Sequence, residues 1–388
     1  MVENCLVVLP QVPYPPDSGG KLRSFHLLKL MTQRYSNLYL LTFFFSRQDK
    51  DNLSSLESIL QIRAEGLPQK KGMFKIILDA GWDKPWVLEK YFSDLMLSRI
   101  TKMVKNDHWL IHFDHPHTGQ YVLYLAGRVD RSKVRFRMDA HNLEWVIAER
   151  TAERYPWFNW IFSWQAERMK VWETRISKVV DSLWVVSQED KMGFVKLGAE
   201  PEKILVVPNG VDLERIRFRE YTGKEKDIVF VGSMDWLPNE DGVLFFLREI
   251  WPIIQKARSD VRFIIVGKNP SERIKKFVSN KVIVTGLVRD VLPYIYDSAL
   301  EVVPLRIGGG SRLKILEAMS AGRAVVSTSI GCEGIACEDG RDILIADQPK
   351  EFAEKVLLLL DDLALRKEIA RQGRRLVEEK YGWQIPED

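Results

Sequence analysis

Pro304-Leu305-Arg306-Ile307-Gly308-Gly309-Gly310-Ser311-Arg312-Leu313-Lys314-Ile315-Leu316-Glu317-Ala318-Met319 is the stretch that decides the fold. An apolar run over residues 299–305 leads into three glycines, and a pattern typical of a helix follows at once. A strand, a glycine turn and a helix in this order create an anion site, because the N–H groups at a helix start lack partners inside the helix and the helix dipole attracts negative charge there. Glycines also let a phosphate come close to the backbone.

Charged side chains flank this glycine turn. Arg312 and Lys314 add cations within the first helical turn. Glu317 lies one to two turns further on, where a carboxylate can accept hydrogen bonds from a sugar hydroxyl. A phosphate at the turn and a ribose at Glu317 would together describe a nucleotide. The alternative is a glycine-rich loop that binds no ligand and is capped by Ser311.

Composition limits the classes of protein that fit. A chain of 388 residues with 46% hydrophobic residues is long enough for two packed domains. The formal net charge of +4 gives no general case for nucleic acid. The three cysteines have no metal spacing and indicate a reducing compartment. Because there is no signal peptide and no long apolar span, we predict a cytoplasmic protein and leave peripheral membrane contact open.

The first half has the rhythm of alternating strands and helices. Residues 6–9, 38–45, 110–113, 135–138 and 182–186 read as strands, and residues 76–78 as a weaker one. Residues 21–32 have helical spacing, and a long helical region runs over about 143–180. This order predicts a parallel sheet covered by helices.

A second series of the same kind begins after residue 227. Its predicted strands and helices are strands 228–231, 262–266, 282–285, 300–305, 324–327 and 343–346, with helices 244–256, 292–296, 313–321, 351–360 and 363–381. Pro208-Asn209-Gly210 marks the boundary. The sequence therefore predicts an α/β protein with domains at 1–207 and 208–375, a terminal segment 376–388, and a ligand cleft between the carboxyl ends of the two sheets.

Three loops of the second half are expected at those strand ends. They are Gly232-Ser233, Gly267-Lys268 and the glycine triplet. A nucleotide lying across the strand ends would meet all three, and Val288 and Arg289 would offer contacts to its base. The alternative is that each glycine only makes a tight turn between a strand and a helix. The prediction of a nucleotide site therefore depends on all three loops lying together.

Polar residues follow three strands of the first half. Gly19 and Gly20 would admit a phosphate or an acceptor close to the backbone. His112-Phe113-Asp114-His115-Pro116-His117 and Asp139-Ala140-His141-Asn142 each follow a predicted strand. Such groups suit the binding of sugar hydroxyls or the handling of protons. A metal site competes, although the spacing matches no common zinc pattern, and any single histidine can be an ordinary loop residue.

The helical region over 143–180 is rich in aromatic residues. Four tryptophans lie between Trp157 and Trp172, with arginines nearby. Apolar positions at helical spacing are more often core than ligand site, and we favour core packing here. The alternative is a surface that meets a membrane or a lipid-linked acceptor.

Several segments of the chain resemble glycosyltransferase family four. The segments that carry the resemblance are 208–212, 231–233, 266–267, 284–286 and 304–326, with a looser likeness at Gly19-Gly20, 112–116 and 186–187. The resemblance implies a GT-B fold, in which two Rossmann-like domains face a cleft. It also implies retaining transfer from a nucleotide-sugar without a metal or another cofactor, and closure of residues 378–383 onto the first domain.

The resemblance carries roles onto individual residues. Glu317 matches the glutamate that binds the ribose, and Gly309 stands where the family has a first glutamate. Lys314, with Arg312, is expected to stabilise the leaving diphosphate. The family's histidine falls on Asp114, with His115 adjacent, and which of the two faces the donor stays open.

The resulting hypothesis has defined residues and partners. The catalytic residues are Asp114, His115, Arg312 and Lys314; the donor residues are Gly19, Gly20, Gly232, Ser233, Gly267, Val288, Arg289, Gly309, Gly310, Ser311 and Glu317; the acceptor residues are His117, His141 and Asn142. The partners are a UDP-, GDP- or similar sugar and a sugar or lipid-linked acceptor, in polysaccharide or glycoconjugate synthesis. The rivals are a nucleotide-sugar epimerase of the same fold and a non-catalytic nucleotide-sugar-binding protein.

Overall fold

The computed structural model describes residues 4–386, which form two compact units. One unit holds the described residues up to Pro208 together with those from Gln384 onward, and the other is Asn209–Trp383. The predicted return segment begins at 376, whereas helix α18 (Leu363–Lys380) stays with the second unit. No helix among residues 4–386 is long and apolar enough to cross a membrane.

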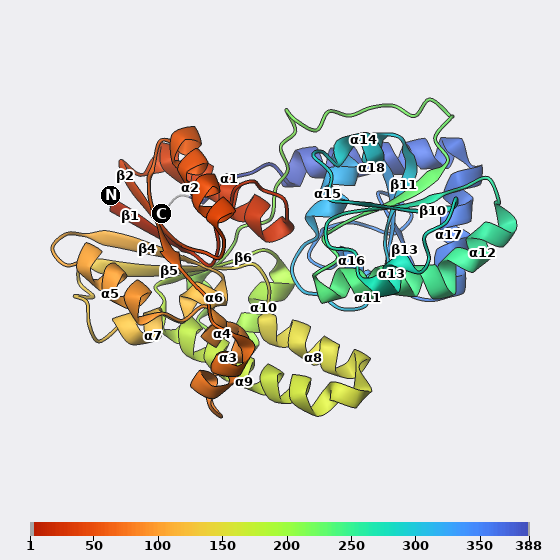
Figure 1. Ribbon diagram of the computed structural model, residues 1–388. Helices are drawn as coiled ribbons and strands as arrows, with labels where there is room; N and C mark the ends of the chain where they lie inside the picture. Colours follow the sequence, from red (N-terminus) through yellow and green to blue (C-terminus); the bar gives the residue numbers. More distant parts are fainter. Residues whose placement is uncertain (1–3, 387–388) are drawn as a thin grey trace. The chain divides into compact units, whose positions relative to one another are not determined.

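The first unit is built on a parallel sheet with the strand order β3-β2-β1-β4-β5-β6-β7 (Figure 1). The strands are β1 (Asn4–Leu9), β2 (Asn37–Phe44), β3 (Arg63–Pro68), β4 (Trp109–Asp114), β5 (Val134–Ala140), β6 (Ser182–Val185) and β7 (Ile204–Val206). The order reverses at β1, which pairs with both β2 and β4. The ends of β1 and β4 therefore form a topological switch point, where α/β sheets place ligands.

Helices cover this sheet and form two separate cores on its faces. They are α1 (Gly19–Arg34), α2 (Arg47–Leu60), α3 (Met73–Ala80), α4 (Trp86–Lys90), α5 (Asp94–Met103), α6 (His115–Gly119), α7 (Val122–Leu125), α8 (Glu144–Arg154), α9 (Asn159–Val179) and α10 (Gln188–Lys196), with 3-10 turns η1 (Pro156–Phe158) and η2 (Pro201–Lys203). Helix α6 follows β4 directly, so its first residues stand at the switch point.

The second unit repeats the plan with the strand order β10-β9-β8-β11-β12-β13. The strands are β8 (Asp227–Val231), β9 (Phe263–Val266), β10 (Val282–Gly286), β11 (Ser298–Val303), β12 (Ala324–Ser327) and β13 (Leu344–Ile345). Strand β8 lies between β9 and β11, all parallel. The glycine after β8 and the glycine triplet after β11 therefore meet at the second switch point. The predicted α/β architecture of two parallel sheets with alternating helices is confirmed.

The helices of the second unit agree with the predicted ones in most positions. They are α11 (Leu237–Phe245), the π-helical turn η3 (Phe246–Ile250), α12 (Trp251–Ala257), α13 (Glu272–Lys275), α14 (Leu292–Tyr296), α15 (Leu313–Ser320), α16 (Ser329–Cys332), α17 (Pro349–Asp361) and α18. The predicted helix 244–256 is thus the later part of a longer helical region that begins at Leu237.

One predicted strand of the first unit was wrong, and the predicted long helical region is present but interrupted. The predicted strand 76–78 belongs to α3, where Ile76 and Ala80, four residues apart, are the buried positions. The structure instead forms β3, which the sequence analysis missed because Arg-Ala-Glu-Gly-Leu-Pro has little apolar character. The single helical region over 143–180 is divided into α8 and α9 at Pro156, which has no backbone N–H to continue a helix.

Candidate functional site

The glycine loops of the second unit are in direct contact at the switch point. A Cβ atom on Gly267 would lie 1.8 Å from the carbonyl oxygen of Gly232. A Cβ atom on Gly232 would lie 2.8 Å from Lys314 Nζ, at the start of α15. No side chain fits at either glycine, so backbone and lysine approach each other closely. The structure therefore brings together the three predicted loops.

Lys314 is held by Asn239, in the first turn of α11. Its Nζ donates a hydrogen bond to Asn239 Oδ1 at 2.9 Å, and Asn239 Nδ2 donates to the backbone oxygen of Ser233 at 2.9 Å. The ammonium also lies 3.9 Å from the centroid of the Phe230 ring. A cation fixed in this way over a glycine turn is suited to a diphosphate.

Burial lowers the pKa of Lys314 to about 7, against the opposing influence of the Glu301 carboxyl. Glu301 lies in the middle of β11, is fully buried, and neither carboxyl oxygen has a hydrogen-bond partner among the described residues. Burial raises its own pKa well above the usual range, against the opposing influence of Lys314. Glu301 was not predicted as a site residue because a single acid within an apolar strand carries no motif.

Glu317 offers an unused carboxylate one turn after Lys314. The residue is partly exposed, and among residues 4–386 no hydrogen bond or ion pair to its carboxylate is present. Burial raises its pKa to about 7, while the Arg215 guanidinium and Lys314 act against this shift. A carboxylate without an internal partner, beside two cations, can accept hydrogen bonds from a hydroxylated ligand.

The glycine triplet is shaped by Arg312. The Arg312 guanidinium donates to the carbonyl oxygen of Gly310 at 2.6 Å and also to that of Gly309. Gly310 has a φ of 66°, and a Cβ atom on Gly308 would lie 2.1 Å from Arg312 Nη2. Through these contacts the buried side chain of Arg312 supports the glycine triplet.

Asn209 anchors the other side of the loop. Its Nδ2 donates to both the backbone oxygen and Oγ of Ser311, at 3.1 and 3.0 Å. The sequence pattern predicted a turn and a domain boundary at Asn209, but not its contacts with Ser311. Val288 packs against a small apolar cluster, and Arg289 is exposed.

The switch point of the first unit carries a buried network of charges. His141 Nε2 lies 2.8 Å from Asp114 Oδ1 and 3.2 Å from Asp139 Oδ2. Arg23 of α1 donates to both oxygens of Asp139, at 2.8 and 2.6 Å. Ser24 Oγ donates to Asp114 Oδ2 at 3.0 Å. Three elements that are distant in sequence, β4, β5 and α1, therefore meet in one cluster.

Gly20, His115 and His117 lie around this network. A Cβ atom on Gly20 would lie 3.6 Å from His115 Nε2, so the glycine start of α1 faces the histidines. The His115 ring lies 3.7 Å from that of His141 and 4.9 Å from that of His117. His115 also has a φ of 64°, a strained conformation for a residue with a Cβ, and such strain gathers at functional sites.

The histidines differ sharply in charge. Burial alone would lower the pKa of His141, but the Asp114 and Asp139 carboxylates outweigh burial and raise it to about 9. Burial lowers the pKa of His112 and of His117 to about 3, and that of His115 well below its usual range. His141 is therefore the charged histidine of the cluster, and it stands beside neutral imidazoles.

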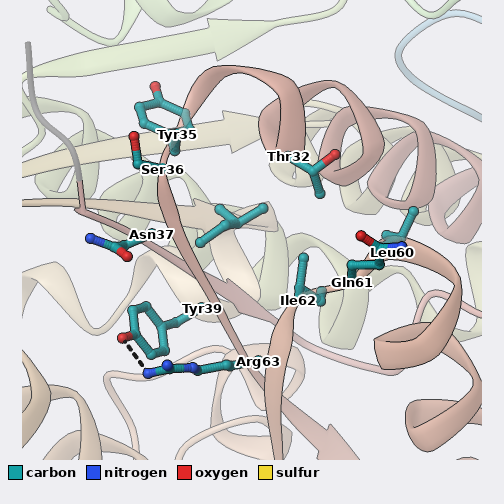
Figure 2. Close-up of a pocket in the computed structure, with 10 residues that line it drawn as sticks. Thr32, Tyr35, Ser36, Asn37, Tyr39, Leu60, Gln61, Ile62 and Arg63 are labelled. Atoms are coloured by element: carbon teal, nitrogen blue, oxygen red, sulfur yellow. Dashed lines mark hydrogen bonds between the residues drawn. The ribbon is translucent and has the colours of Figure 1, made fainter.

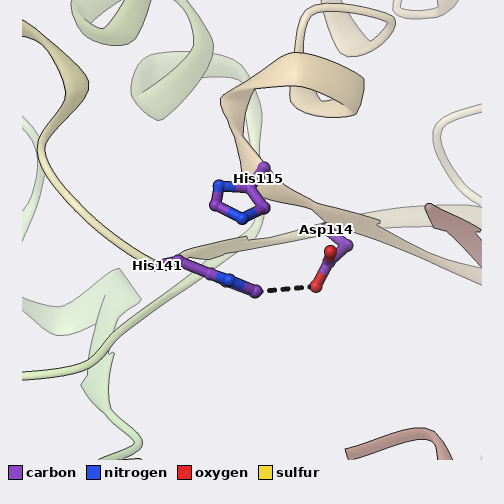
Figure 3. A group of neighbouring side chains, drawn as sticks. All are labelled: Asp114, His115 and His141. Carbon is purple, nitrogen blue, oxygen red and sulfur yellow. Dashed lines mark hydrogen bonds and ion pairs between the residues drawn. The ribbon is translucent and has the colours of Figure 1, made fainter. Parts of the chain in front are cut away.

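Asp114, His115 and His141 are close enough in space to share a metal ion (Figure 3). Asp114 is already bonded to His141 and Ser24, and the nearby Asp139 is bonded to Arg23. These side chains are therefore already paired with one another, and a metal ion would have to replace these contacts.

The charge of His141 leads to a prediction about pH. Its pKa is raised from 6.5 to about 9, so its stabilising effect is complete below pH 6.5 and is lost as the pH rises through about 9. The loss should reach about 3 kcal/mol in the free energy of unfolding. Urea unfolding of the natural protein and of His141→Gln, measured between these pH values, should show the natural protein losing about this much stability relative to the variant, because other groups titrate alike in both proteins. Parallel curves for the two proteins would contradict it.

A depression of about 350 Å³ opens at the other end of the first sheet. Figure 2 shows that it is lined by the end of α1, the starts of β2 and β3, and the end of α2. Arg63, the one charged residue in its lining, donates to the Tyr39 hydroxyl at 3.0 Å. The depression lies at amino ends of strands and holds no cluster of reactive groups, so it is not the candidate site.

Models of two protein families match the chain. "Glycosyl transferases group 1" matches residues 225–362, and "Glycosyltransferase Family 4" matches residues 70–215. Together the two models match well over half of the sequence.

Two bacterial proteins are similar to this chain in sequence. A Klebsiella pneumoniae protein described as "uncharacterized 44.6 kDa protein in cps region" is 23% identical over 97% of this chain and 96% of its own. The N,N'-diacetylbacillosaminyl-diphospho-undecaprenol alpha-1,3-N-acetylgalactosaminyltransferase of Campylobacter jejuni is 28% identical over 49% of this chain, and the match spans 54% of that protein.

Solved structures share the fold across almost the whole chain. Sucrose-phosphate synthase from Thermosynechococcus elongatus superposes with a TM-score of 0.76 at 15% identity, covering 98% of this chain and 95% of its own. Anabaena HepE in complex with UDP-glucose gives a TM-score of 0.68 at 14% identity, covering 97% and 95%. At such identities the likeness is one of fold.

Proposed function

The chain belongs to glycosyltransferase family 4, and from this premise we propose that it transfers a sugar from a nucleotide-sugar to a hydroxyl acceptor with retention of anomeric configuration. The observation that carries the proposal is the convergence of three loops on Lys314 at the switch point of the second unit. UDP-glucose is bound by Anabaena HepE, so UDP-sugars are the first donors to test.

The donor would occupy the second unit. Glu317 accepts hydrogen bonds from the ribose hydroxyls, and the diphosphate lies against the glycine triplet and the Lys314 ammonium. At the position of Gly309 the chain offers backbone groups, and the donor sugar meets no carboxylate there.

In the transfer step the acceptor oxygen forms a bond to the anomeric carbon. The bond from that carbon to the diphosphate oxygen breaks, and the acceptor's proton passes to the leaving diphosphate on the same face. Negative charge grows on the diphosphate during this step, and Lys314 is placed to stabilise it. In this proposal the residues of the chain stabilise the leaving diphosphate without a metal ion.

The network of the first unit would receive the acceptor. Protonated His141 and neutral His115 present ring nitrogens beside Gly20, where hydroxyl groups can approach the backbone. Asp114 keeps His141 charged and oriented. We propose a polysaccharide or glycoconjugate as the product class, with support from the Klebsiella relative in the cps region and from the lipid-linked acceptor in the name of the Campylobacter relative.

A single assay separates this function from its rivals. The protein is incubated with a panel of nucleotide-sugars, with and without sugar or polyprenyl-diphosphate-sugar acceptors, and free nucleotide is measured. Release only with an acceptor supports transfer, and NMR of the product anomer tests retention. Interconversion of sugars without release would indicate an epimerase. Binding without turnover would indicate a non-catalytic protein.

Replacing Glu317 with alanine should weaken nucleotide binding by about 10- to 100-fold, because the ribose hydroxyls lose a charged acceptor. Isothermal titration calorimetry with UDP and GDP measures the effect. Glu354→Ala, in an exposed residue of α17, is the control and should bind as the natural protein does. Unchanged affinity in Glu317→Ala would remove this residue from the site.

A further inference from the structure

An exposed apolar surface lies on the first unit, away from the charged network. Helix α3 exposes Met73, Phe74, Ile77 and Leu78, and the loop after it exposes Trp82. The start of the α9 region exposes Trp157, Phe158 and Trp160. The exposed fractions are 77% for Phe74, 83% for Trp82, 89% for Trp157 and 71% for Trp160. The expectation that this aromatic region is core was therefore wrong for these residues, although Trp172 is buried.

The two segments form one surface, which we call the aromatic patch. The Trp82 and Trp164 rings lie 5.7 Å apart, edge to face, and Trp164 stands one helical turn after Trp160. Arg168, a further turn along, donates to the backbone oxygens of Gly81 and Lys84 at 2.8 and 3.2 Å. These contacts fasten the loop after α3 to α9, and Figure 1 shows the two helices side by side.

Exposure of this kind requires a partner. Four large aromatic side chains in open water are unfavourable, and contiguous apolar patches mark sites of interaction. Trp and Phe are the residues that enter the boundary between headgroups and acyl chains. The apolar face of α3 is turned outward, as in helices that lie in a membrane surface.

The charges beside the patch select the partner. Arg154 is the only charged residue between Glu153 and Glu167, so the α9 part carries no carboxylate. Lys70 and Lys75 are exposed at the start of α3, where the Asp79 carboxylate lies 3.5 Å from Lys71, and Asp83 is exposed next to Trp82. Apolar anchors flanked by cations fit a bilayer with anionic headgroups.

We propose that the aromatic patch docks the first unit on an anionic phospholipid bilayer. The docking does not depend on catalysis, so vesicle binding without substrates tests it separately from the transferase reaction. On the proposed function, it would bring the first unit to lipid-linked acceptors.

The test is flotation of the full chain with phosphatidylcholine vesicles, with and without phosphatidylglycerol. The natural protein should float with the anionic vesicles, and its tryptophan emission should shift to shorter wavelength. Trp157→Ser/Trp160→Ser and Phe74→Ser/Leu78→Ser should each lower binding by about tenfold or more. The matched control is Ile59→Ser/Met192→Ser, which removes half-exposed apolar residues of α2 and α10 and should bind normally.

Two results would overturn the proposal. The first is a failure in the vesicle assay: the natural protein stays unbound, or the patch variants bind as well as the control. The second is a change of oligomeric state: sedimentation shows that the natural protein is a dimer and that both patch variants are monomers, because the patch would then be covered by a second copy. Circular dichroism confirms that each variant is folded, and turnover with a water-soluble acceptor should be unchanged in both.

Discussion

A Lys314→Met protein is expected to turn over about 100- to 1,000-fold more slowly than the natural protein while keeping most of its nucleotide affinity. Methionine has a similar length and can still pack against Phe230, although the hydrogen bond from Nζ to Asn239 is lost. What is lost is the ammonium at the place where negative charge grows on the leaving diphosphate. The effect should therefore fall on kcat more than on binding.

The pH profile gives a second measure of the same residue. Because the pKa of Lys314 is about 7, its charged form declines as the pH rises above that value, and kcat should decline with it. A bound diphosphate favours the charged form and moves the decline to higher pH. The methionine variant should lack this limb of the profile.

The control is Lys350→Met, in an exposed lysine whose side chain lies at the start of α17. It removes the same charge far along the chain from the glycine triplet and should leave kcat unchanged. If Lys314→Met retained normal turnover, or lost affinity and turnover in equal measure, a role at the leaving group would be wrong.

The second switch point was predictable from sequence because its parts are local. Gly232, the glycine triplet and Lys314 each stand next to an apolar strand or a helix start, and the strand order of an α/β sheet brings such ends together. Position alone therefore predicted the convergence of the loops. What Arg312 does was less accessible, because the pattern shows a cation but not the carbonyl groups to which it turns.

The first-unit network shows the opposite case. Asp114 and His141 were visible as polar residues after strands, but their pairing depends on the register of β4 against β5, which places Asp114 beside Asp139. Arg23 sits within a helix whose spacing suggested only an amphipathic surface. Its contact with Asp139 joins residues 116 positions apart, and no local pattern encodes such a distance.

Packing in the folded chain also explains the two predictions that were wrong, the strand over residues 76–78 and the aromatic core near Trp157. Ile76-Ile77-Leu78 is apolar enough for a strand, but the flanking Met73, Phe74 and Ala80 complete a helical repeat that packs on one side only. The tryptophans near Trp157 have helical spacing as core residues do. Trp157, Phe158 and Trp160 lie in and just after the 3-10 turn that begins at Pro156, and their side chains are exposed, whereas residues further along α9 are buried.

An Asp139→Asn protein should lose about 3–5 kcal/mol in its free energy of unfolding. Arg23 and Asp139 are 1% and 0% exposed, and the guanidinium makes two hydrogen bonds to the carboxylate. The asparagine leaves a buried positive charge without its counterion, and it also removes one of the two carboxylates that hold His141 charged.

The pH dependence should change in the direction that this pairing requires. The Arg23 and His141 charges, working against burial, hold the pKa of Asp139 well below its usual range. Its stabilising effect is therefore present above about pH 4, the ordinary value for an aspartate, and is lost on acidification. Asp139→Asn should unfold with a smaller acid dependence than the natural protein.

Two further variants decide whether the cost comes from the unpaired charge. Glu65→Gln breaks the ion pair between Glu65 and Arg99, whose side chains are 38% and 46% exposed, respectively. Because this pair is exposed, its loss should lower the free energy of unfolding by no more than about 1 kcal/mol. Arg23→Met/Asp139→Leu removes both buried charges together and should recover most of the stability that Asp139→Asn loses, because no charge is left unpaired in the core. Urea unfolding at pH 7 compares all three. An Asp139→Asn protein as stable as Glu65→Gln, or a double variant less stable than the single one, would show that Arg23 does not depend on Asp139 and that the network is held by other contacts.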